Sequence, residues 1–142
     1  MNPTGFSTID HSPEVVAKWL DEIEQQLHWK DAQKNYHLLR ATLHTLRDWL
    51  TVDEAADLAA QLPVLIRGIY YEGWDPSATP MRPRTREAFL KRLVERYAAG
   101  AFPDPLTAAG AVFAVLKKYV SEGEIRQVRY SLPRELQDLW QK

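Results

Sequence analysis

Four side chains near the middle of the chain have the types needed for acid–base chemistry. Glu72 and Asp75 supply two carboxylates, and the phenols of Tyr70 and Tyr71 directly precede them. A hydrolytic or acid–base enzyme needs such titratable groups to converge in one pocket. A simpler structural explanation exists, because Glu72 ends an expected helix and Asp75 begins an ordinary Asp-Pro turn. The chain has no nucleophile elbow, P-loop or dinucleotide-binding glycine motif, so we assign no catalytic residue and favour a protein that is not an enzyme.

The four histidines form no recognisable metal-binding pattern. His37 and His44 lie seven residues apart on one expected helix, two turns from each other, whereas helical zinc motifs place two ligands three or four residues apart. The chain has no cysteine, which excludes a zinc–cysteine site, thiolate catalysis and a disulfide framework. Recruitment of His11 or His28 from another helix stays open. The prediction is a protein without a metal site and without a cofactor.

Basic residues are concentrated in the second half of the chain, although the whole chain has a net charge of −1. Residues 1–70 hold 6 Lys/Arg and 10 Asp/Glu, whereas residues 71–142 hold 12 Lys/Arg and 9 Asp/Glu. Nucleic-acid binding by this basic half is therefore the alternative function, although a dedicated binder is usually more basic overall. The residues concerned are Arg82, Arg84, Arg86, Lys91, Arg92, Arg96, Lys117, Lys118, Arg126, Arg129 and Arg134.

The uneven charge also predicts ion pairs between the two halves, within one chain or between neighbours. Several must act together to matter, since one surface pair contributes only about 0–1 kcal/mol. The acidic partners would be Asp21, Glu22 and Glu24, and the basic partners Lys91, Arg92 and Arg96.

Aromatic and basic residues around a central proline-rich stretch form the candidate binding site. These residues are Arg67, Tyr71, Trp74, Arg82 and Arg84. Aromatic side chains beside arginines are typical of protein interfaces. The alternative is that Tyr71 and Trp74 fill a seam inside the protein, and we expect Trp74 to be partly buried.

Capping residues and prolines divide the chain into amphipathic helices. Behind the first start, Val16, Trp19, Ile23 and Leu27 recur with helical spacing and predict one buried face. Residues 73–84 contain three prolines and a glycine and predict a linker without helix. The predicted helix starts are Ser12-Pro13, Asp31, Thr51, Pro63, Thr85, Asp104-Pro105, Ser121 and Pro133. Thr51 with Glu54 and Ser121 with Glu124 also have the form of a capping box.

The second half repeats the first at an offset of 70 residues without a gap. Identical residues at this offset include Ala41 and Ala111, Leu46 and Leu116, Glu54 and Glu124, Leu62 and Leu132, and Pro63 and Pro133. Coincidence of cap, core and breaker positions at one register indicates an internal duplication. The prediction is an all-α protein of two tandem four-helix units, about eight helices, with units at 12–72 and 85–142 joined by the linker 73–84. The units are expected to superpose helix for helix and to pack as one compact domain.

Two segments carry a resemblance to a known family. They are LPVLIRGIYYEGW at residues 62–74 and RTREAFL at residues 84–90, followed by a related stretch from Gly123 to Pro133. The chain resembles the bacterial and archaeal family catalogued as domain of unknown function 2267, from about Val16 to Trp140. The resemblance implies a helical fold and a prokaryotic source, and it brings no catalytic residues.

The predicted function is a non-catalytic protein–protein interaction or regulatory module whose partner is another protein or a second copy. The N-terminus lacks a secretory signal, and no apolar run reaches the length of a membrane span. We therefore expect a cytoplasmic protein without a membrane partner.

Overall fold

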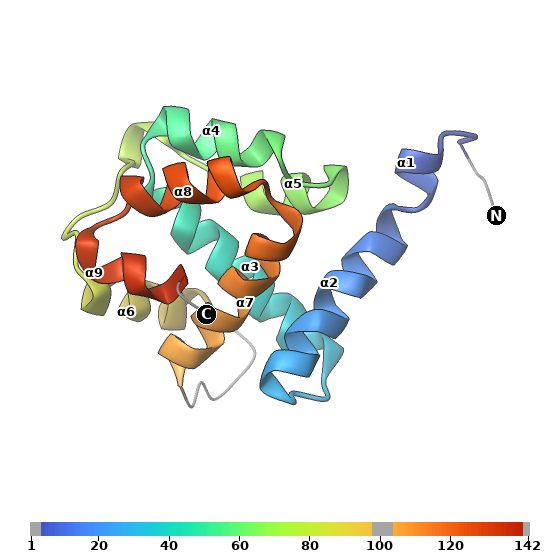
Figure 1. The fold of residues 1–142 in the computed structure, drawn as a ribbon, viewed down its shortest axis with the longest axis horizontal. Helices are drawn as coiled ribbons and strands as arrows, with labels where there is room; N and C mark the ends of the chain where they lie inside the picture. Colours follow the sequence, from blue (N-terminus) through green and yellow to red (C-terminus); the bar gives the residue numbers. More distant parts are fainter. Residues whose placement is uncertain (1–3, 98–103, 141–142) are drawn as a thin grey trace.

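The computed structural model describes residues 4–97 and 104–140, and within these ranges the chain is helical without strands (Figure 1). This confirms the all-α prediction. The predicted second unit, 85–142, includes residues 98–103 and 141–142, which lie outside the described ranges. The elements are α1 Ser7–Asp10, α2 Ser12–Leu27, α3 Ala32–Trp49, α4 Val52–Ala60, α5 Val64–Tyr71, the 3-10 helix η1 Pro76–Ala78, α6 Arg86–Arg96, α7 Pro105–Tyr119, α8 Glu122–Ser131, α9 Arg134–Gln137 and the 3-10 helix η2 Asp138–Trp140.

Most of the predicted helix starts are capped as the sequence indicates. Asp31 Oδ1 accepts a hydrogen bond from the backbone N–H of Gln33 at 3.0 Å. A cap of this kind satisfies an N–H that has no partner inside the helix, which is why short polar residues define the start. The same role is filled at α4, α6, α7 and α8 by Thr51, Thr85, Asp104 and Ser121.

The predicted N-cap role of Ser12 is wrong. Helix α2 begins at Ser12 itself, and its N-cap position is occupied by His11. The preceding residues form α1, a helix that the sequence analysis did not include, and the Ser12 Oγ donates to the Thr8 carbonyl at 2.8 Å. The hydroxyl is therefore used by the α1–α2 junction and is not available to cap α2.

The two predicted capping boxes are only half formed. The N–H groups of Glu54 and Glu124 donate to the hydroxyls of Thr51 and Ser121. The reciprocal bond to a glutamate carboxylate is absent at both helices in the part of the chain that the structure describes. The Ser121 N–H donates instead to Gln61 Oε1 at 3.3 Å, which leaves the Glu124 carboxylate buried between α4 and α8.

The linker 73–84 contains one turn of helix, η1, which corrects the prediction of a stretch without helix. Asp75 Oδ1 accepts from the Ser77 N–H at 3.1 Å. Pro76 is tolerated because its missing N–H would have no helical partner in the first turn. The chain after η1 is fixed to α3, since the Met81 N–H donates to the Asp48 carbonyl at 2.7 Å.

Two long helices, α3 and α7, lie at the centre of the protein and the others pack around them (Figure 1). Helix α2 contacts α7, and α6 contacts α3. The first helix of each predicted unit therefore packs on the second helix of the other, while α4 packs on α8. These reciprocal contacts agree with a two-fold relation between the units, and the duplication itself stays a prediction.

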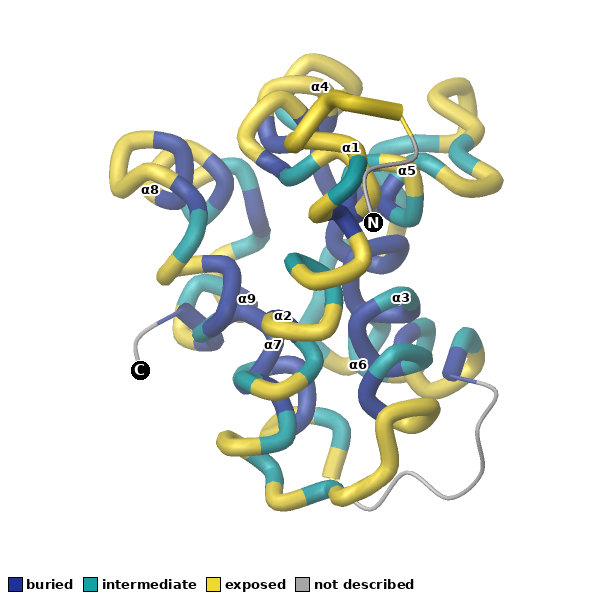
Figure 2. Tube along the Cα trace, turned by 90° about the vertical axis from the view of Figure 1, so that its right-hand side faces the viewer, coloured by how far each residue is buried: buried dark blue, intermediate teal, exposed yellow. Residues whose placement is uncertain are grey.

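A continuous apolar core runs through both halves of the chain, and α3 is buried along most of its length (Figure 2). Trp49, Phe89, Phe113 and Trp140 contact one another in succession, with ring centroids 5.5, 6.2 and 4.2 Å apart. Each such aromatic pair contributes about 0.5–1.5 kcal/mol beyond the area that it buries. The row runs from α3 in the first half to η2 at the end of the second, so the halves are joined by shared packing.

Candidate functional site

Tyr71 and Trp74, the aromatic pair of the predicted site, lie against each other at the edge of the core. Their ring centroids are 5.2 Å apart with an interplanar angle of 30°. Both are half-buried, as expected for Trp74. Tyr70 is a core residue, since its ring is fully buried and its hydroxyl donates to the Ala55 carbonyl at 2.8 Å. This burial raises the pKa of Tyr70 well above its usual value.

We expect the substitution Trp74→Ala to lower the free energy of unfolding by about 1–2 kcal/mol, because only part of the ring is removed from water. Urea unfolding followed by circular dichroism measures this cost. A loss of about 3–5 kcal/mol, the range for a fully buried large side chain, would contradict the half-buried position and mean that the ring fills an internal seam.

Arg67 is engaged with its own unit and not with the aromatic pair. Its Nε donates to the Ala59 carbonyl and its Nη2 to the Leu62 carbonyl, both at 2.9 Å. Carbonyl groups at the end of a helix such as α4 have no intrahelical donor. Arg67 therefore caps the C-terminal end of α4.

Arg84 holds the linker to both halves of the chain, whereas Arg82 is exposed. The Nη1 and Nη2 atoms of Arg84 each donate over 3.1 Å, to the carbonyls of Trp49 and Ser131 respectively. Burial lowers the pKa of Arg84, and the neighbouring charge of Arg82 acts in the same direction. The five predicted site residues thus fall into an aromatic pair, two arginines that bind backbone carbonyls, and one exposed arginine.

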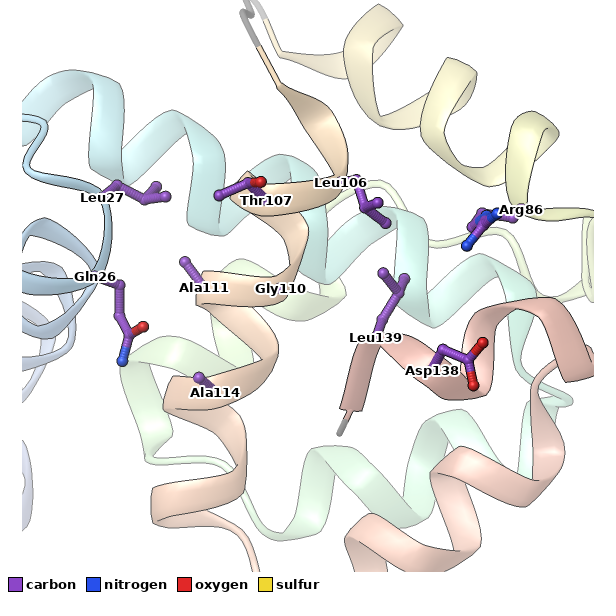
Figure 3. A pocket seen from close by; sticks show the side chains of 10 residues that line it. All are labelled: Gln26, Leu27, Arg86, Leu106, Thr107, Gly110, Ala111, Ala114, Asp138 and Leu139. Atoms are coloured by element: carbon purple, nitrogen blue, oxygen red, sulfur yellow. The ribbon is translucent and has the colours of Figure 1, made fainter. Parts of the chain in front are cut away.

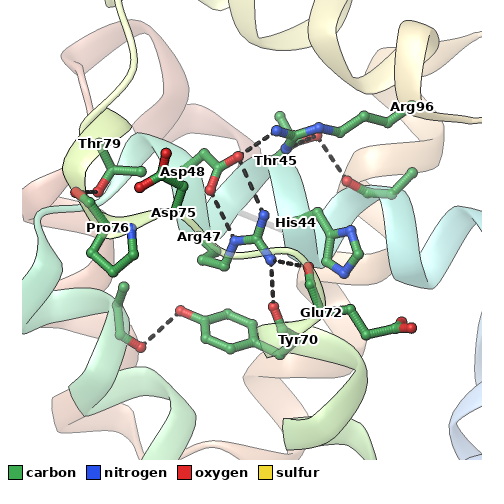
Figure 4. Close-up of polar contacts among 12 residues, drawn as sticks. His44, Thr45, Arg47, Asp48, Tyr70, Glu72, Asp75, Pro76, Thr79 and Arg96 are labelled. Atoms are coloured by element: carbon green, nitrogen blue, oxygen red, sulfur yellow. Dashed lines mark hydrogen bonds and ion pairs between the residues drawn. The ribbon is translucent and has the colours of Figure 1, made fainter.

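A buried ionic network that the sequence analysis missed joins α3 to α6 (Figure 4). Arg47 Nε donates to Asp48 Oδ1 at 2.8 Å. Arg96 pairs with the other oxygen of Asp48 and also donates to the Thr45 hydroxyl at 3.4 Å. One buried carboxylate is therefore shared between two guanidinium groups.

The same network reaches the end of α5, where Arg47 Nη1 donates to the Tyr70 and Glu72 carbonyls at 2.9 and 2.8 Å. His44 lies beside it and donates from Nε2 to the Ile69 carbonyl at 2.7 Å. Burial lowers the pKa of His44, so its ring is neutral at pH 7. The network ties α3, α5 and α6 together, and its polar groups are occupied by these structural bonds.

The two carboxylates considered for acid–base chemistry also have structural partners. Glu72 accepts a hydrogen bond from Arg40 at 3.1 Å, and Asp75 caps η1. In residues 4–97 and 104–140, no group of three or more His, Asp or Glu side chains is arranged to hold a metal ion. Over the same residues, no helix combines the length and apolar character needed to cross a membrane.

Several charges of the basic half are engaged in bonds within the chain, whereas others, such as Lys91 and Arg134, are exposed. Arg96 belongs to the network, and Lys117 Nζ donates to the Trp140 carbonyl at 2.9 Å. Lys118 pairs with Glu22. Among the described residues, Glu22 thus pairs with Lys118 and not with Lys91, Arg92 or Arg96, and this pair joins the two halves. Pairing with a neighbouring chain stays a prediction.

An exposed apolar surface lies where α1 and α2 meet α5, and we call it the α1–α5 surface. Phe6 and Ile9 are 67% and 52% exposed, and Val64 and Leu65 are 46% and 43% exposed. Helix α1 projects away from the body of the protein (Figure 1). A groove of about 150 Å³ separates α1 and α2 from α5, and Pro63, Val64 and Leu65 form one of its walls.

The exposed apolar pair on α5 is not a requirement of the fold. Seventy positions later, at the start of α9, Arg134 and Glu135 follow Pro133 as Val64 and Leu65 follow Pro63. Both charged residues are exposed. A helix that begins after proline at this point accepts charged residues, so the apolar choice on α5 calls for a different explanation.

A scan of protein families matches residues 16–139 to the family described as "Uncharacterized conserved protein (DUF2267)". The chain belongs to this family. A search of curated proteins finds no match. The family match covers α3 to α9 and most of α2 but begins after α1, so α1 lies outside the matched part of the chain.

A pocket of about 500 Å³ lies along α7 and has the size of a small-molecule site (Figure 3). Small and apolar residues of α7, including Gly110, Ala111 and Ala114, form its floor. Gln26 lies at one end, and Arg86 and Asp138 lie at the other. Because these polar groups do not converge, the pocket offers no arrangement for a reaction.

Proposed function

We propose that the chain is a non-catalytic protein-interaction module that self-associates through the α1–α5 surface. The observation that carries this proposal is an apolar groove with the exposed side chains of Val64 and Leu65 in one wall. Two more exposed apolar side chains, Phe6 and Ile9, are next in the sequence to the groove residues Ser7 and Thr8. Contiguous exposed apolar surface of this kind is characteristic of protein-binding sites. The groove lining contains no Asp, Glu, Lys or Arg, which favours an apolar occupant over a charged one.

A second copy of the chain fits this surface because the surface has both exposed apolar side chains and a groove that can receive such side chains from another copy. Phe6, directly before α1, and Ile9, within it, are exposed apolar side chains, and the groove beside α5 offers a place to bury such a side chain. A two-fold interface brings the same patch together from both copies, so each α1 reaches the groove of the other. A cavity of about 150 Å³ holds a benzene-sized group, which matches the ring of Phe6.

We expect the wild-type chain to sediment as a dimer and the double variant Val64→Arg, Leu65→Glu to sediment as a monomer. The variant places on α5 the two residues that α9 already carries, so the helix is expected to form normally. Sedimentation equilibrium over a range of protein concentrations measures the association, and thermal unfolding confirms that the variant is folded. Phe6→Glu, on the opposite side of the contact, is expected to have the same effect.

The matched control is Val94→Glu on α6, where an exposed valine lies outside the α1–α5 surface. It is expected to leave the dimer intact. A wild-type chain that stays monomeric at every concentration, or a dimer that Val94→Glu disrupts as strongly as Leu65→Glu, would contradict the proposal.

A further inference from the structure

A third pocket, formed by residues of the second half of the chain, is lined by basic and aromatic side chains. It has a volume of about 310 Å³ and lies between α8, the end of α7 and η2. We call it the α8 pocket. Its charged lining residues are Lys117, Arg126 and Arg129, against the single carboxylate of Glu122. The lining therefore has a net charge of +2, which favours an anion.

Two N–H donors that belong to lining residues of the α8 pocket have no acceptor in the part of the chain that the structure describes. They are Arg129 Nε and Trp140 Nε1, and both atoms are buried. Buried polar groups are nearly always hydrogen-bonded, so each exception calls for an explanation. An indole Nε1 and a guanidinium Nε can only donate, so the partner that each lacks is an acceptor, such as an oxygen of an anionic ligand.

Tyr130 adds an exposed aromatic ring to the same pocket, with 70% of its surface accessible. An aromatic ring next to arginines is the usual platform for a base, which stacks on the ring while the cations hold the phosphate. Arginine also binds phosphate through two parallel N–H donors. The chemistry of the lining thus suits a ligand that has a phosphate and a planar ring together.

The residues that give the pocket this character are not needed to build the helix. Seventy positions earlier, α4 carries Ala56, Ala59 and Ala60 in place of Arg126, Arg129 and Tyr130. Alanine is the best helix former, and α4 forms with it. The two arginines and the tyrosine are therefore additions to α8 that the fold does not explain.

We propose that the α8 pocket binds a nucleotide, with its phosphate held by Arg126 and Arg129 and its base against Tyr130. This site is separate from the α1–α5 surface and does not depend on self-association. The sequence analysis gave nucleic-acid binding by the whole basic half as the alternative function. The present proposal assigns binding to three side chains of α8 only. The nucleotide comes either free in solution or as one unit of a single strand, and the chemistry of the pocket is the same for both.

Isothermal titration calorimetry at low ionic strength tests the proposal with AMP, ribose 5-phosphate and a single-stranded oligoadenylate as probes. AMP is expected to bind about tenfold more tightly than ribose 5-phosphate, because only AMP has a base to stack. Arg126→Ala and Arg129→Ala are each expected to weaken binding of both probes by about tenfold or more. Tyr130→Ala is expected to reduce AMP to the affinity of ribose 5-phosphate while leaving ribose 5-phosphate unchanged.

The matched control is Lys34→Ala, which removes an exposed charge at the start of α3, in the other half of the chain. It is expected to leave every affinity unchanged. Tighter binding of oligoadenylate than of AMP, with a steep dependence on salt, would identify a strand as the source, and equal affinities would identify the free nucleotide. Absence of binding by AMP and oligoadenylate at low salt would overturn the proposal. It would equally be overturned if ribose 5-phosphate or a phosphoserine peptide bound as tightly as AMP with no effect of Tyr130→Ala.

Discussion

The substitution Asp48→Asn is expected to lower the free energy of unfolding by about 3–5 kcal/mol. Asparagine has the shape of aspartate but no charge, so Arg47 and Arg96 would lose the carboxylate that they share in the folded protein. Removing one member of a buried ion pair is costly because the charge left behind remains desolvated. Urea unfolding monitored by circular dichroism measures the loss.

Two further variants test whether the cost of Asp48→Asn comes from the burial of the network or from the loss of any negative charge. Asp21→Asn removes an exposed carboxylate on α2 and is expected to change the stability by no more than about 0.5 kcal/mol. Arg96→Gln removes the surplus positive charge and keeps the Arg47–Asp48 pair, so it is expected to cost less than Asp48→Asn. A cost below about 1 kcal/mol for Asp48→Asn would mean that water screens the network as it screens a surface pair.

Helix boundaries could be predicted from the sequence because they depend on neighbours within a few residues. The side chains of Asp31, Thr85 and Asp104 bond to N–H groups two or three positions ahead, and this geometry needs no tertiary contact. Ser12 was the exception. Its hydroxyl donates to the Thr8 carbonyl in α1 and so does not cap α2. Helix α1 is short and has no apolar periodicity from which it could have been predicted.

Arginine partners could not be predicted, because a long side chain selects its acceptor from whatever the folded chain brings near. Arg67 and Arg84 looked like surface residues ready for a partner, yet both bind carbonyls at helix ends. Arg47 and Asp48 are adjacent in the sequence, and no pattern there singles them out. They are buried because α3 is packed on all sides near its end, where every residue from 41 to 50 is buried.

The predicted internal repeat also relates part of this network to a contact in the second half of the chain. Arg47 donates to the Tyr70 carbonyl, and Lys117 donates to the Trp140 carbonyl. The two donors are 70 positions apart, and so are the two acceptors. In both halves a basic residue near the end of the second helix therefore binds the backbone carbonyl of an aromatic residue near the end of the unit. An alignment of the two units that compared polar positions as well as apolar ones would have shown that Arg47 and Lys117, both basic, are equivalent.

The apolar surface of α5 was hidden by the same feature that predicted the helix. A short run as apolar as residues 64–71 is normally taken as buried on all sides. Helix α5 lies at the edge of the protein, and of its residues only Ile66 and Tyr70 are buried. At the offset of 70 residues, Val64 and Leu65 correspond to the charged residues Arg134 and Glu135. This comparison was available in the sequence, and it indicates that these two positions face solvent.

A second prediction with a large expected effect concerns Glu124, which was predicted to complete a capping box and is instead buried. Its side chain is on α8 with 8% of the residue exposed, and its Oε2 has no hydrogen-bond partner among the described residues. Glu54, the identical residue 70 positions earlier, lies on α4, which packs on α8. Burial raises the pKa of Glu124 from 4.5 to about 7, and repulsion from Glu54 and Asp57 is a smaller cause in the same direction.

This raised pKa makes the protein more stable in mild acid. Between pH 4.5 and pH 7 the folded chain holds a proton on Glu124 that the unfolded chain has released. Stability therefore falls as the pH rises through this window. The contribution is fully present below about pH 4.5 and lost above about pH 7, and one pKa unit corresponds to about 1.4 kcal/mol.

The substitution Glu124→Gln is expected to remove this dependence, because glutamine keeps the shape of the protonated acid and never ionises. At pH 8 it is expected to raise the free energy of unfolding by up to about 3 kcal/mol, and at pH 4 to change it little. Urea unfolding at several pH values between 4 and 8 measures both. Glu95→Gln, an exposed glutamate on α6, serves as the control and is expected to follow the wild-type profile. If the wild-type and Glu124→Gln profiles run parallel, the Glu124 carboxylate is solvated in solution, and α4 and α8 do not enclose it as the structure shows.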